Sequence, residues 1–267
     1  DAAKMGVSGE DPVLFLYTSG TTGVPKAAVL THRNLVSYAD AMVKASGLEH
    51  GDPILLNVPL NHVGGAVMAV MSALAKGNKL VLMDAFVPDE TLEVIEREKV
   101  AVMGQVPAQY ALELLSPNVG KYDLSSIRIA IVSGQACPPE LISRIREMMG
   151  VLPRNAYGLT EVSGAITFTH PDHGPDKLKA TVGRPVEGID LVIVDSDGNI
   201  LPPGQVGEIA VKGNPVMRGY WRRESENAIV FDRQGYLHTG DMGMLDDDGF
   251  LVMSGRKKEM YTRGGEN

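Results

Sequence analysis

The chain has 267 residues, long enough for one large domain or two modest ones with a sizeable core. Hydrophobic residues make up 44% and charged residues 22%, which is ordinary globular composition and excludes an intrinsically disordered chain. The formal net charge of −8 argues against a general binder of nucleic acid or of an anionic membrane surface, because both attract positive charge.

Short apolar runs alternate with helical patterns up to about residue 165. Residues 13–17 form a continuous apolar run, which predicts a strand buried on both faces. After Asn34 apolar side chains recur at helical spacing as far as Val43, and Gly47 stands where a helix-ending glycine is expected. Two further strands are expected at residues 79–83 and 127–132. Two further helices are expected at residues 88–99 and 138–149. Strands that alternate with helices predict crossover connections, so the expected fold class is α/β with a mostly parallel sheet.

The pattern changes near residue 180. Four short segments beyond it are expected to be strands separated by turns rich in Asp, Gly and Pro, namely residues 189–195, 207–212, 236–238 and 250–254. No segment with a helix-length period is obvious among them. We therefore expect a smaller β-rich, barrel-like subdomain after the α/β part.

Cysteine content, hydropathy and the first residue bear on location and completeness. The single cysteine, Cys137, excludes an intrachain disulfide and fits a reducing compartment, so we expect a cytoplasmic protein. The longest mostly apolar stretch, residues 63–75, is too short to cross a bilayer, and no membrane span is expected. The chain begins at Asp1 without an initiator methionine, which predicts a segment of something longer.

The most informative stretch is a loop rich in Ser, Thr and Gly that ends in a lysine. It follows the first expected strand and runs from Tyr17 to Lys26 with the sequence YTSGTTGVPK. Its donors and flexible positions are Thr18, Ser19, Gly20, Thr21, Thr22 and Gly23. Such a loop suits a polyphosphate, because glycines let the backbone approach, amide and hydroxyl groups donate, and the lysine neutralises charge. The glycine spacing excludes the GxxxxGK[ST] loop of P-loop ATPases, and an ordinary surface loop is the alternative.

This stretch resembles the signature of the acyl-adenylate-forming (AMP-binding) superfamily, which includes acyl-CoA synthetases, luciferases and peptide-synthetase adenylation domains. Further segments resemble motifs of the same family in the same order along the chain. They are residues 157–161 (YGLTE), 236–241 (YLHTGD), 255–259 (GRKKE) and 264–267 (GGEN). The resemblance implies a fragment of the large N-terminal domain of an enzyme that activates a carboxylic acid with ATP and Mg²⁺, forming acyl-AMP and releasing pyrophosphate.

The resemblance assigns catalytic roles to three residues. Lys26 offsets charge on the pyrophosphate, and Thr160 offers its hydroxyl to the α-phosphate. Glu161 offers a carboxylate oxygen to Mg²⁺, a hard cation that prefers oxygen ligands and substrate phosphates. For Glu161 the alternative is an acid at a helix start, following Thr160.

Other residues are expected to hold the adenine of the nucleotide. Tyr157, next to Gly158 in the same motif, covers one face of the base, unless it is a plain core aromatic. The segment Ser133, Gly134 and Gln135 is expected against the other face. The resemblance places Asn155 near the adenine amino group.

The last motifs are expected to bind the ribose and to begin a second domain. Asp241 accepts hydrogen bonds from the ribose hydroxyls and Arg256 is a second ribose contact, with a turn aspartate and a solvated cation as the alternatives. Lys258 falls at the hinge of the family. Gly264 and Gly265 let the backbone approach coenzyme A, unless they are only turn glycines.

The acyl group is expected near residues 63–66 and 164–166, where small and apolar residues would leave room for a fatty or aryl acid. His62 and Gly64 are expected to line this pocket, and a polar residue at a strand-to-helix turn is the alternative for His62. The other histidines show no metal-ligand spacing, so we expect no zinc site.

The resemblance as a whole implies an acyl-CoA synthetase that makes acyl-AMP and then a thioester with coenzyme A. Two alternatives stay open, a carrier-protein-loading adenylation domain and a non-catalytic nucleotide-binding fragment. The expected parts are an ATP- and acyl-binding subdomain at residues 1–179, a β-rich subdomain at 180–255 and a hinge region at 256–267. The family places the lysine of the adenylation step beyond the hinge, so the segment alone is expected to be a poor catalyst. Expected partners are the acid and coenzyme A, and whether the chain forms homo-oligomers stays open.

Overall fold

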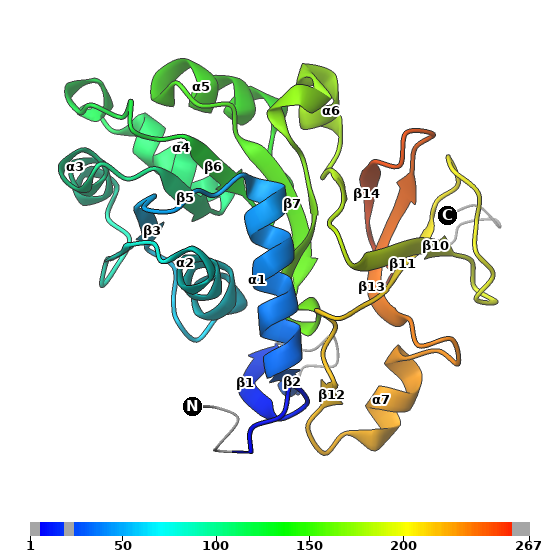
Figure 1. Cartoon of the computed structure of the whole chain (residues 1–267). Helices are drawn as coiled ribbons and strands as arrows, with labels where there is room; N and C mark the ends of the chain where they lie inside the picture. The colour runs from blue at the N-terminus through cyan, green and yellow to red at the C-terminus, as the bar shows by residue number, and fades with distance from the viewer. Residues whose placement is uncertain (1–5, 19–23, 258–267) are drawn as a thin grey trace.

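The computed structural model describes residues 6–18 and 24–257 of the chain (Figure 1). Its centre is a seven-stranded sheet with the order β4-β3-β5-β6-β7-β8-β9. The strands are β3 (Ile54–Leu56), β4 (Leu80–Leu82), β5 (Val102–Gln105), β6 (Ile129–Val132), β7 (Arg154–Leu159), β8 (Gly164–Phe168) and β9 (Arg184–Pro185). The first five strands in this order run parallel, and β8 and β9 are antiparallel to their neighbours. The predicted α/β class with a mostly parallel sheet is confirmed.

Helices cover both faces of this sheet, as Figure 1 shows. On one face lie α1 (His32–Ser46) and the π-helix η2 (Gly64–Ala69), which continues into α2 (Val70–Lys76). On the other face lie α3 (Pro88–Glu98), α4 (Pro107–Leu115) and α5 (Pro139–Met149). Because neighbouring residues of a strand face opposite sides, the strands feed two cores, with Ile54 and Val102 in one and Leu55 and Met103 in the other. Shorter helical turns are η3 (Val119–Lys121), η4 (Thr160–Val162), η5 (Pro171–His173) and α6 (Pro175–Ala180).

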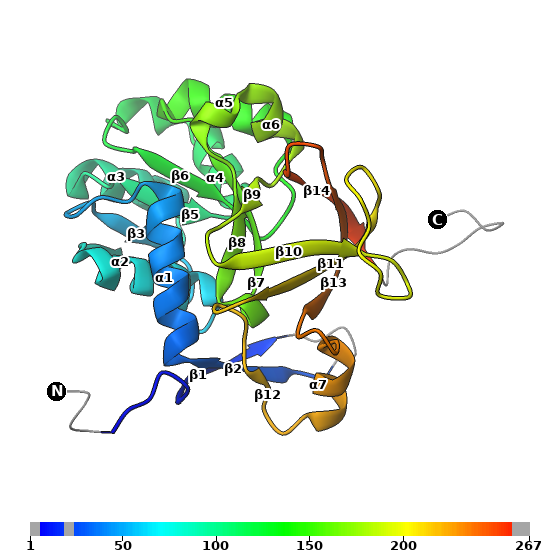
Figure 2. The same ribbon diagram turned by 45° about the vertical axis from the view of Figure 1, so that its right-hand side comes forward.

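Two smaller antiparallel sheets flank the central one (Figure 2). The first has the order β1-β2-β12 and consists of β1 (Pro12–Thr18), β2 (Lys26–Thr31) and β12 (Gly219–Tyr220). The second has the order β10-β11-β13-β14 and consists of β10 (Ile189–Val194), β11 (Gly207–Gly213), β13 (Leu237–Leu245) and β14 (Leu251–Arg256). This order leaves β10 and β14 at the two edges, so the sheet is open where a barrel-like form was expected. The short helix α7 (Glu224–Val230) was not expected from the sequence.

Helix ends follow the predicted signals closely. The α1 helix begins after Thr31, whose side chain accepts from the backbone N–H of Asn34, and it ends at Gly47 with φ of 63°. In α3 the first residue is Pro88, and α5 ends at Gly150 with φ of 71°. Local capping chemistry therefore sets these boundaries. The division of the chain at residues 179 and 255 stays a prediction. The strand β12 lies within the expected second part, at 180–255, but it pairs with β2 of the first part.

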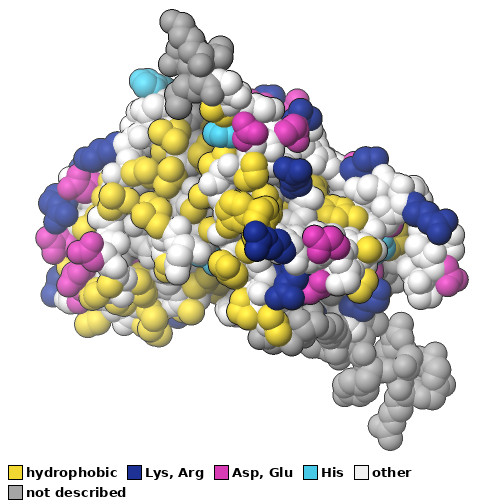
Figure 3. All heavy atoms as spheres, turned by 90° about the horizontal axis from the view of Figure 1, so that it is seen from below, with side chains coloured by type: hydrophobic (Ala, Val, Ile, Leu, Met, Phe, Trp, Pro, Cys, Tyr) yellow, Lys and Arg dark blue, Asp and Glu magenta, His cyan; other side chains and the backbone are white. Residues whose placement is uncertain are grey.

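The first strand differs from its prediction. In β1 the side chains of Val13, Phe15 and Tyr17 are 38%, 43% and 71% exposed, whereas Leu16 is buried. The strand pairs with β2 in an antiparallel hairpin, so only one of its faces packs on the core. The Phe15 ring packs edge-on against Trp221, with the ring centroids 5.2 Å apart. Seen from below, hydrophobic side chains cover much of this part of the surface (Figure 3).

Within residues 6–18 and 24–257, no helix has the length and apolar character that crossing a bilayer requires.

Candidate functional site

The first group of predicted residues meets where β2 begins, beside β12 and the turn η4. Lys26 is the first residue of β2, and its ammonium lies 5.2 Å from the centroid of the Tyr220 ring. Tyr220 belongs to β12, and its hydroxyl donates to Oε1 of Glu161 at 2.7 Å. Glu161 lies in η4, directly after β7. Two residues predicted from separate motifs, a cation and a carboxylate, thus lie on two sides of one tyrosine.

Close backbone contacts hold η4 in place. A Cβ at Gly158 would lie 1.8 Å from the carbonyl oxygen of Gly164, so only glycine allows β7 and β8 to approach this closely. Ser163 ends the turn with φ of 64°, and its hydroxyl donates to the carbonyl of Pro215 at 2.7 Å. The backbone carbonyl of Glu161 accepts from a backbone N–H two residues before β12 at 2.7 Å. The turn that carries Glu161 is therefore fixed to the segment that leads into Tyr220.

A second group joins the central sheet to the β-rich sheet. The hydroxyl of Tyr157, on β7, donates to Oδ2 of Asp241 on β13 at 2.8 Å. Arg256 Nε lies 3.3 Å from Oδ1 of the same carboxylate, and the backbone N–H of Asp241 donates to Oγ1 of Thr239. Burial of the Tyr157 side chain, with the Asp241 charge beside it, raises the pKa of Tyr157 well above its ordinary value. The structure brings together three residues that the sequence assigned to adenine and ribose.

The adenine segment is only partly at the surface. Ser133 follows β6, and its backbone N–H donates to the carbonyl of Gln105 at the end of β5, while Gly134 and Gln135 are exposed. Asn155 is buried, and its amide nitrogen donates to the carbonyls of Leu178 and Thr181. Its amide oxygen is enclosed with no partner among the described residues. The Asn155 side chain is thus held in the interior, and its contact with adenine stays a prediction.

The predicted acyl segment shows packing roles. His62 is exposed, and its Nδ1 accepts from the backbone N–H of Gly64 at 3.0 Å, which fits the alternative of a polar residue at a strand-to-helix turn. A Cβ at Gly65 would lie 2.5 Å from the carbonyl oxygen of Pro59. At Gly164 a Cβ would meet side chains of the η2 and α1 helices at 2.8 and 2.9 Å, so the small size of this residue serves close packing. The acyl pocket itself stays a prediction.

Several predicted residues fall outside the part of the chain that the structure describes. They are Ser19, Gly20, Thr21, Thr22, Gly23, Lys258, Gly264 and Gly265.

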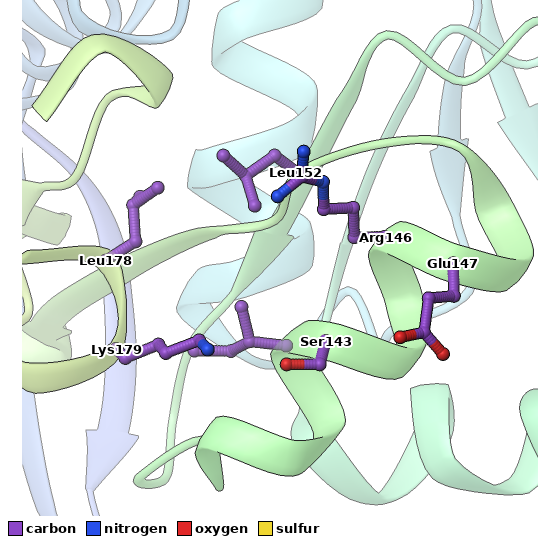
Figure 4. A pocket seen from close by; sticks show the side chains of 7 residues that line it. Ser143, Arg146, Glu147, Leu152, Leu178 and Lys179 are labelled. Carbon is purple, nitrogen blue, oxygen red and sulfur yellow. The ribbon is translucent and has the colours of Figure 1, made fainter. Parts of the chain in front are cut away.

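A cavity of about 320 Å³ lies elsewhere, beside α5 and α6 (Figure 4). It combines apolar side chains with exposed polar ones, and its lining residues are Ile142, Ser143, Arg146, Glu147, Leu152, Leu178 and Lys179. None of these is a predicted site residue. The candidate site therefore consists of the two side-chain groups above and does not include this cavity.

The donor set fits Mg²⁺ only together with a polyphosphate. No cluster of three or more His, Cys, Asp or Glu side chains that could hold a metal occurs in residues 6–18 and 24–257. Glu161 offers one carboxylate, of which Oε1 already accepts from Tyr220. Because Mg²⁺ is commonly held by one or two carboxylates, substrate phosphates and water, this arrangement suits it and needs no protein cage.

Sequence reasoning missed Tyr220 and Glu208. Tyr220 lies outside the five quoted motifs, and nothing in its spacing pointed to Glu161. Glu208 is buried and accepts from Lys257 at 2.7 Å, from His238 at 3.1 Å and from the backbone N–H of Gly240 at 3.1 Å. The Lys257 side chain is 55% exposed, and its ammonium pairs with this buried carboxylate.

Comparisons with known proteins agree with the motif resemblance. The model of a family described as "AMP-binding enzyme" matches residues 2–221. The indoleacetate–CoA ligase of Aromatoleum aromaticum is 38% identical over 261 residues, which cover 98% of this chain and 51% of that protein. A long-chain-fatty-acid–CoA ligase of Bacillus subtilis is 34% identical over 260 residues, which cover 96% and 46%. O-succinylbenzoate coenzyme A synthetase from Bacillus subtilis, solved in complex with ATP and magnesium ion, matches with a TM-score of 0.89 at 32% identity over 98% of this chain and 53% of that one. The chain spans about half the length of the curated relatives it matches.

Proposed function

The chain belongs to the AMP-binding enzyme family, and from that membership we propose that it binds ATP with Mg²⁺ and a carboxylic acid. In the proposed reaction the full-length protein joins the acid to AMP, releases pyrophosphate and then transfers the acyl group to coenzyme A. The observation that carries this proposal is the meeting of Lys26 and Glu161 on two sides of Tyr220. An ATP-dependent step needs a cation for phosphate oxygens and a carboxylate for Mg²⁺ at one place.

The proposed chemistry follows from the poor reactivity of a carboxylate toward nucleophiles. A carboxylate oxygen attacks the α-phosphorus of ATP, the bond from that phosphorus to pyrophosphate breaks, and the acid gains AMP as a good leaving group. Lys26 offsets the charge that develops on pyrophosphate, and the Thr160 hydroxyl donates to an oxygen of the α-phosphate. Glu161 would hold Mg²⁺, which supplies further neutralisation of phosphate charge. The thiol of coenzyme A then attacks the acyl carbon and AMP leaves.

The second group of residues is proposed to hold the nucleoside. Asp241 and Arg256 are assigned to the ribose hydroxyls, and Tyr157 with the segment 133–135 to the adenine. In support, Tyr157 donates to Asp241 at 2.8 Å, so the base and ribose contacts form one connected unit. The contact of Gly264 and Gly265 with coenzyme A remains part of the proposal.

We propose a fatty or aryl acid as the substrate. Two relatives support this class, since one is named for an aryl acid, indoleacetate, and another for long-chain fatty acids. The apolar residues near η2 and β8, among them Val63 and Ile166, are compatible with an apolar acyl group.

A pyrophosphate-exchange assay on the full-length protein tests the adenylation step. With a panel of aliphatic and aryl acids, we expect acid-dependent exchange of labelled pyrophosphate into ATP, and an acyl-CoA when free coenzyme A is added. Glu161→Gln should lose most of the exchange because a neutral amide replaces a charged ligand of Mg²⁺, whereas the matched surface change Glu187→Gln should retain it.

Three results would contradict parts of the proposal. ATP binding without exchange for any acid would favour a non-catalytic nucleotide-binding protein. Adenylate formation with loading of a carrier-protein thiol, and no acyl-CoA, would favour a carrier-loading adenylation domain. Unchanged exchange in Glu161→Gln would remove the metal role of that residue.

A further inference from the structure

We infer that Tyr220 is a positioning residue that holds Glu161 with its hydroxyl and Lys26 with its ring face. This inference rests on the proposed function, since it assigns a role at the proposed site for ATP and Mg²⁺. It concerns a residue that lies in none of the motifs on which the family resemblance was based.

The hydroxyl contact fixes one oxygen of the carboxylate. Tyr220 Oη donates to Glu161 Oε1 at 2.7 Å, and Tyr220 is partly buried. Oε2 of Glu161 has no hydrogen-bond or ion partner among the described residues. A free glutamate side chain has several rotamers, and ordering it when a metal binds costs free energy. A hydrogen bond that holds Oε1 beforehand reduces that cost and leaves Oε2 for the metal.

The ring contact holds a cation without neutralising it. Lys26 Nζ lies 5.2 Å from the ring centroid, within the range of a cation–π interaction. Among the described residues no carboxylate forms an ion pair with this ammonium, and its charge acts on the Glu226 carboxylate only through space. An acidic partner would compensate the charge that a phosphate needs, whereas an aromatic face leaves the full charge available. The tyrosine therefore orients Lys26 and keeps it suited to an anion.

Neighbouring contacts fix Tyr220 itself. Its backbone pairs with Ala28 of β2, two residues from Lys26. Its N–H donates to Oδ1 of Asn227 at 2.7 Å, and Nδ2 of Asn227 donates back to the Tyr220 carbonyl at 3.0 Å. Two further backbone hydrogen bonds tie the flanking residues to β2. The N–H of Arg218 donates to the carbonyl of Val29, and the N–H of Trp221 donates to the carbonyl of Ala27. A side chain on so constrained a backbone can serve as a fixed reference for both charged groups.

The competing explanation is that Tyr220 only fills space between the β1-β2-β12 sheet and the turn η4 of the central sheet. A phenylalanine would then serve equally well, since it retains the ring and loses only the hydroxyl. The two explanations therefore separate in the variant Tyr220→Phe. Tyr236→Phe is the matched control, because the hydroxyl of Tyr236 also donates to a carboxylate, that of Asp190 at 2.5 Å, on the surface of the β-rich sheet.

The experiment is calorimetric titration of the full-length protein with ATP at a series of MgCl₂ concentrations. For Tyr220→Phe we expect the Mg²⁺ concentration of half-maximal ATP binding to rise about tenfold, the size expected for a lost bond to a charged group, with metal-free ATP binding unchanged. Tyr220→Leu should also weaken metal-free ATP binding about threefold, because Lys26 loses the ring. In a Glu161→Gln background, Tyr220→Phe should have no further effect on the Mg²⁺ dependence.

Each other outcome has a definite reading. A Tyr220→Phe protein with the Mg²⁺ dependence of the wild type, or one that loses the same amount in the Glu161→Gln background, overturns the positioning role and leaves the proposed function standing. A loss of equal size in Tyr236→Phe overturns it as well, because the effect would then not belong to the site. A wild-type protein that binds no ATP at any Mg²⁺ concentration overturns the proposed function, and the inference with it.

Discussion

Glu113 places an ionisable carboxyl group in the apolar core formed by β5, α4 and α5. The residue is 0% exposed, and its Oε1 accepts from the amide nitrogen of Gln105 at 2.6 Å. Its Oε2 is buried without a partner among the described residues. Burial raises the pKa of Glu113 from 4.5 to about 8, with the hydrogen bond from Gln105 acting in the opposite direction. The folded protein therefore keeps this carboxyl protonated at neutral pH.

The consequence is a loss of stability as the pH rises. Between pH 4.5 and about pH 8 the folded state binds the proton and the unfolded state does not, so the free energy of unfolding falls throughout this window. Below the window both states are protonated, and above it neither is. Because each pKa unit corresponds to about 1.4 kcal/mol, the full effect is on the order of 5 kcal/mol, of which roughly 3–4 kcal/mol appears between pH 5 and pH 8.

Glu113→Gln isolates this contribution, because the amide cannot titrate and its oxygen still accepts from Gln105. Urea unfolding of the wild type and of the variant, from pH 5 to pH 8.5, should show the variant gaining stability relative to the wild type by roughly 3–4 kcal/mol between pH 5 and pH 8. Glu147→Gln, a change of an exposed acid on α5, should run parallel to the wild type. A difference between Glu113→Gln and the wild type that stays constant across this range would refute the reasoning.

Two further predictions concern single contacts near the site. Gly158→Ala should destabilise the protein by about 3 kcal/mol or more, since the new Cβ would collide with the Gly164 carbonyl. The control Gly120→Ala has open space at its Cβ and should change the melting temperature little. Equal shifts of the melting temperature in the two variants would contradict the close approach of β7 and β8. Glu208→Gln should cost about 1.5–3 kcal/mol at neutral pH, because it weakens the charged bond to Lys257. Burial raises the pKa of Glu208, but the pairing with Lys257 outweighs it and holds this pKa below its usual value. In thermal melts the difference in stability between the variant and the wild type should therefore vanish once the pH falls below the pKa of Glu208 in the folded protein. A difference that persists in acid would exclude this origin.

Local signals predicted the helix ends and the parallel part of the sheet. Gly47 and Gly150 end α1 and α5 as expected, because glycine adopts the left-handed conformation after a helix at the least cost, although Lys99 takes the same position after α3. The strands at 79–83 and 127–132 were found within two residues, since each contains a short continuous apolar run, although only β6 is buried along its whole length. These features depend on residues that are neighbours in sequence.

Features set by distant packing were predicted poorly. The apolar run at 13–17 looks like a strand buried on both faces, and no sequence pattern says that one face of β1 lies open beside Trp221. The contact of Asn155 with adenine stays a prediction, but no sequence pattern says that the carbonyls of Leu178 in α6 and of Thr181 directly after it accept from its amide. In both cases the partner that decides the environment comes from a segment far along the chain.

The candidate site shows why motifs identified its residues and missed its organisation. Lys26, Glu161 and Asp241 lie at the start of β2, after β7 and on β13, so no single element holds two of them. Each carboxylate is instead held by a tyrosine hydroxyl, Glu161 by Tyr220 and Asp241 by Tyr157. Burial, and then the adjacent carboxylate, raises the pKa of both tyrosines, so each hydroxyl stays a donor even in alkaline solution. A phenol that donates orders a carboxylate without neutralising its charge, which an arginine or lysine in the same place would do, and the negative charge of Glu161 stays available to a cation bound with phosphate.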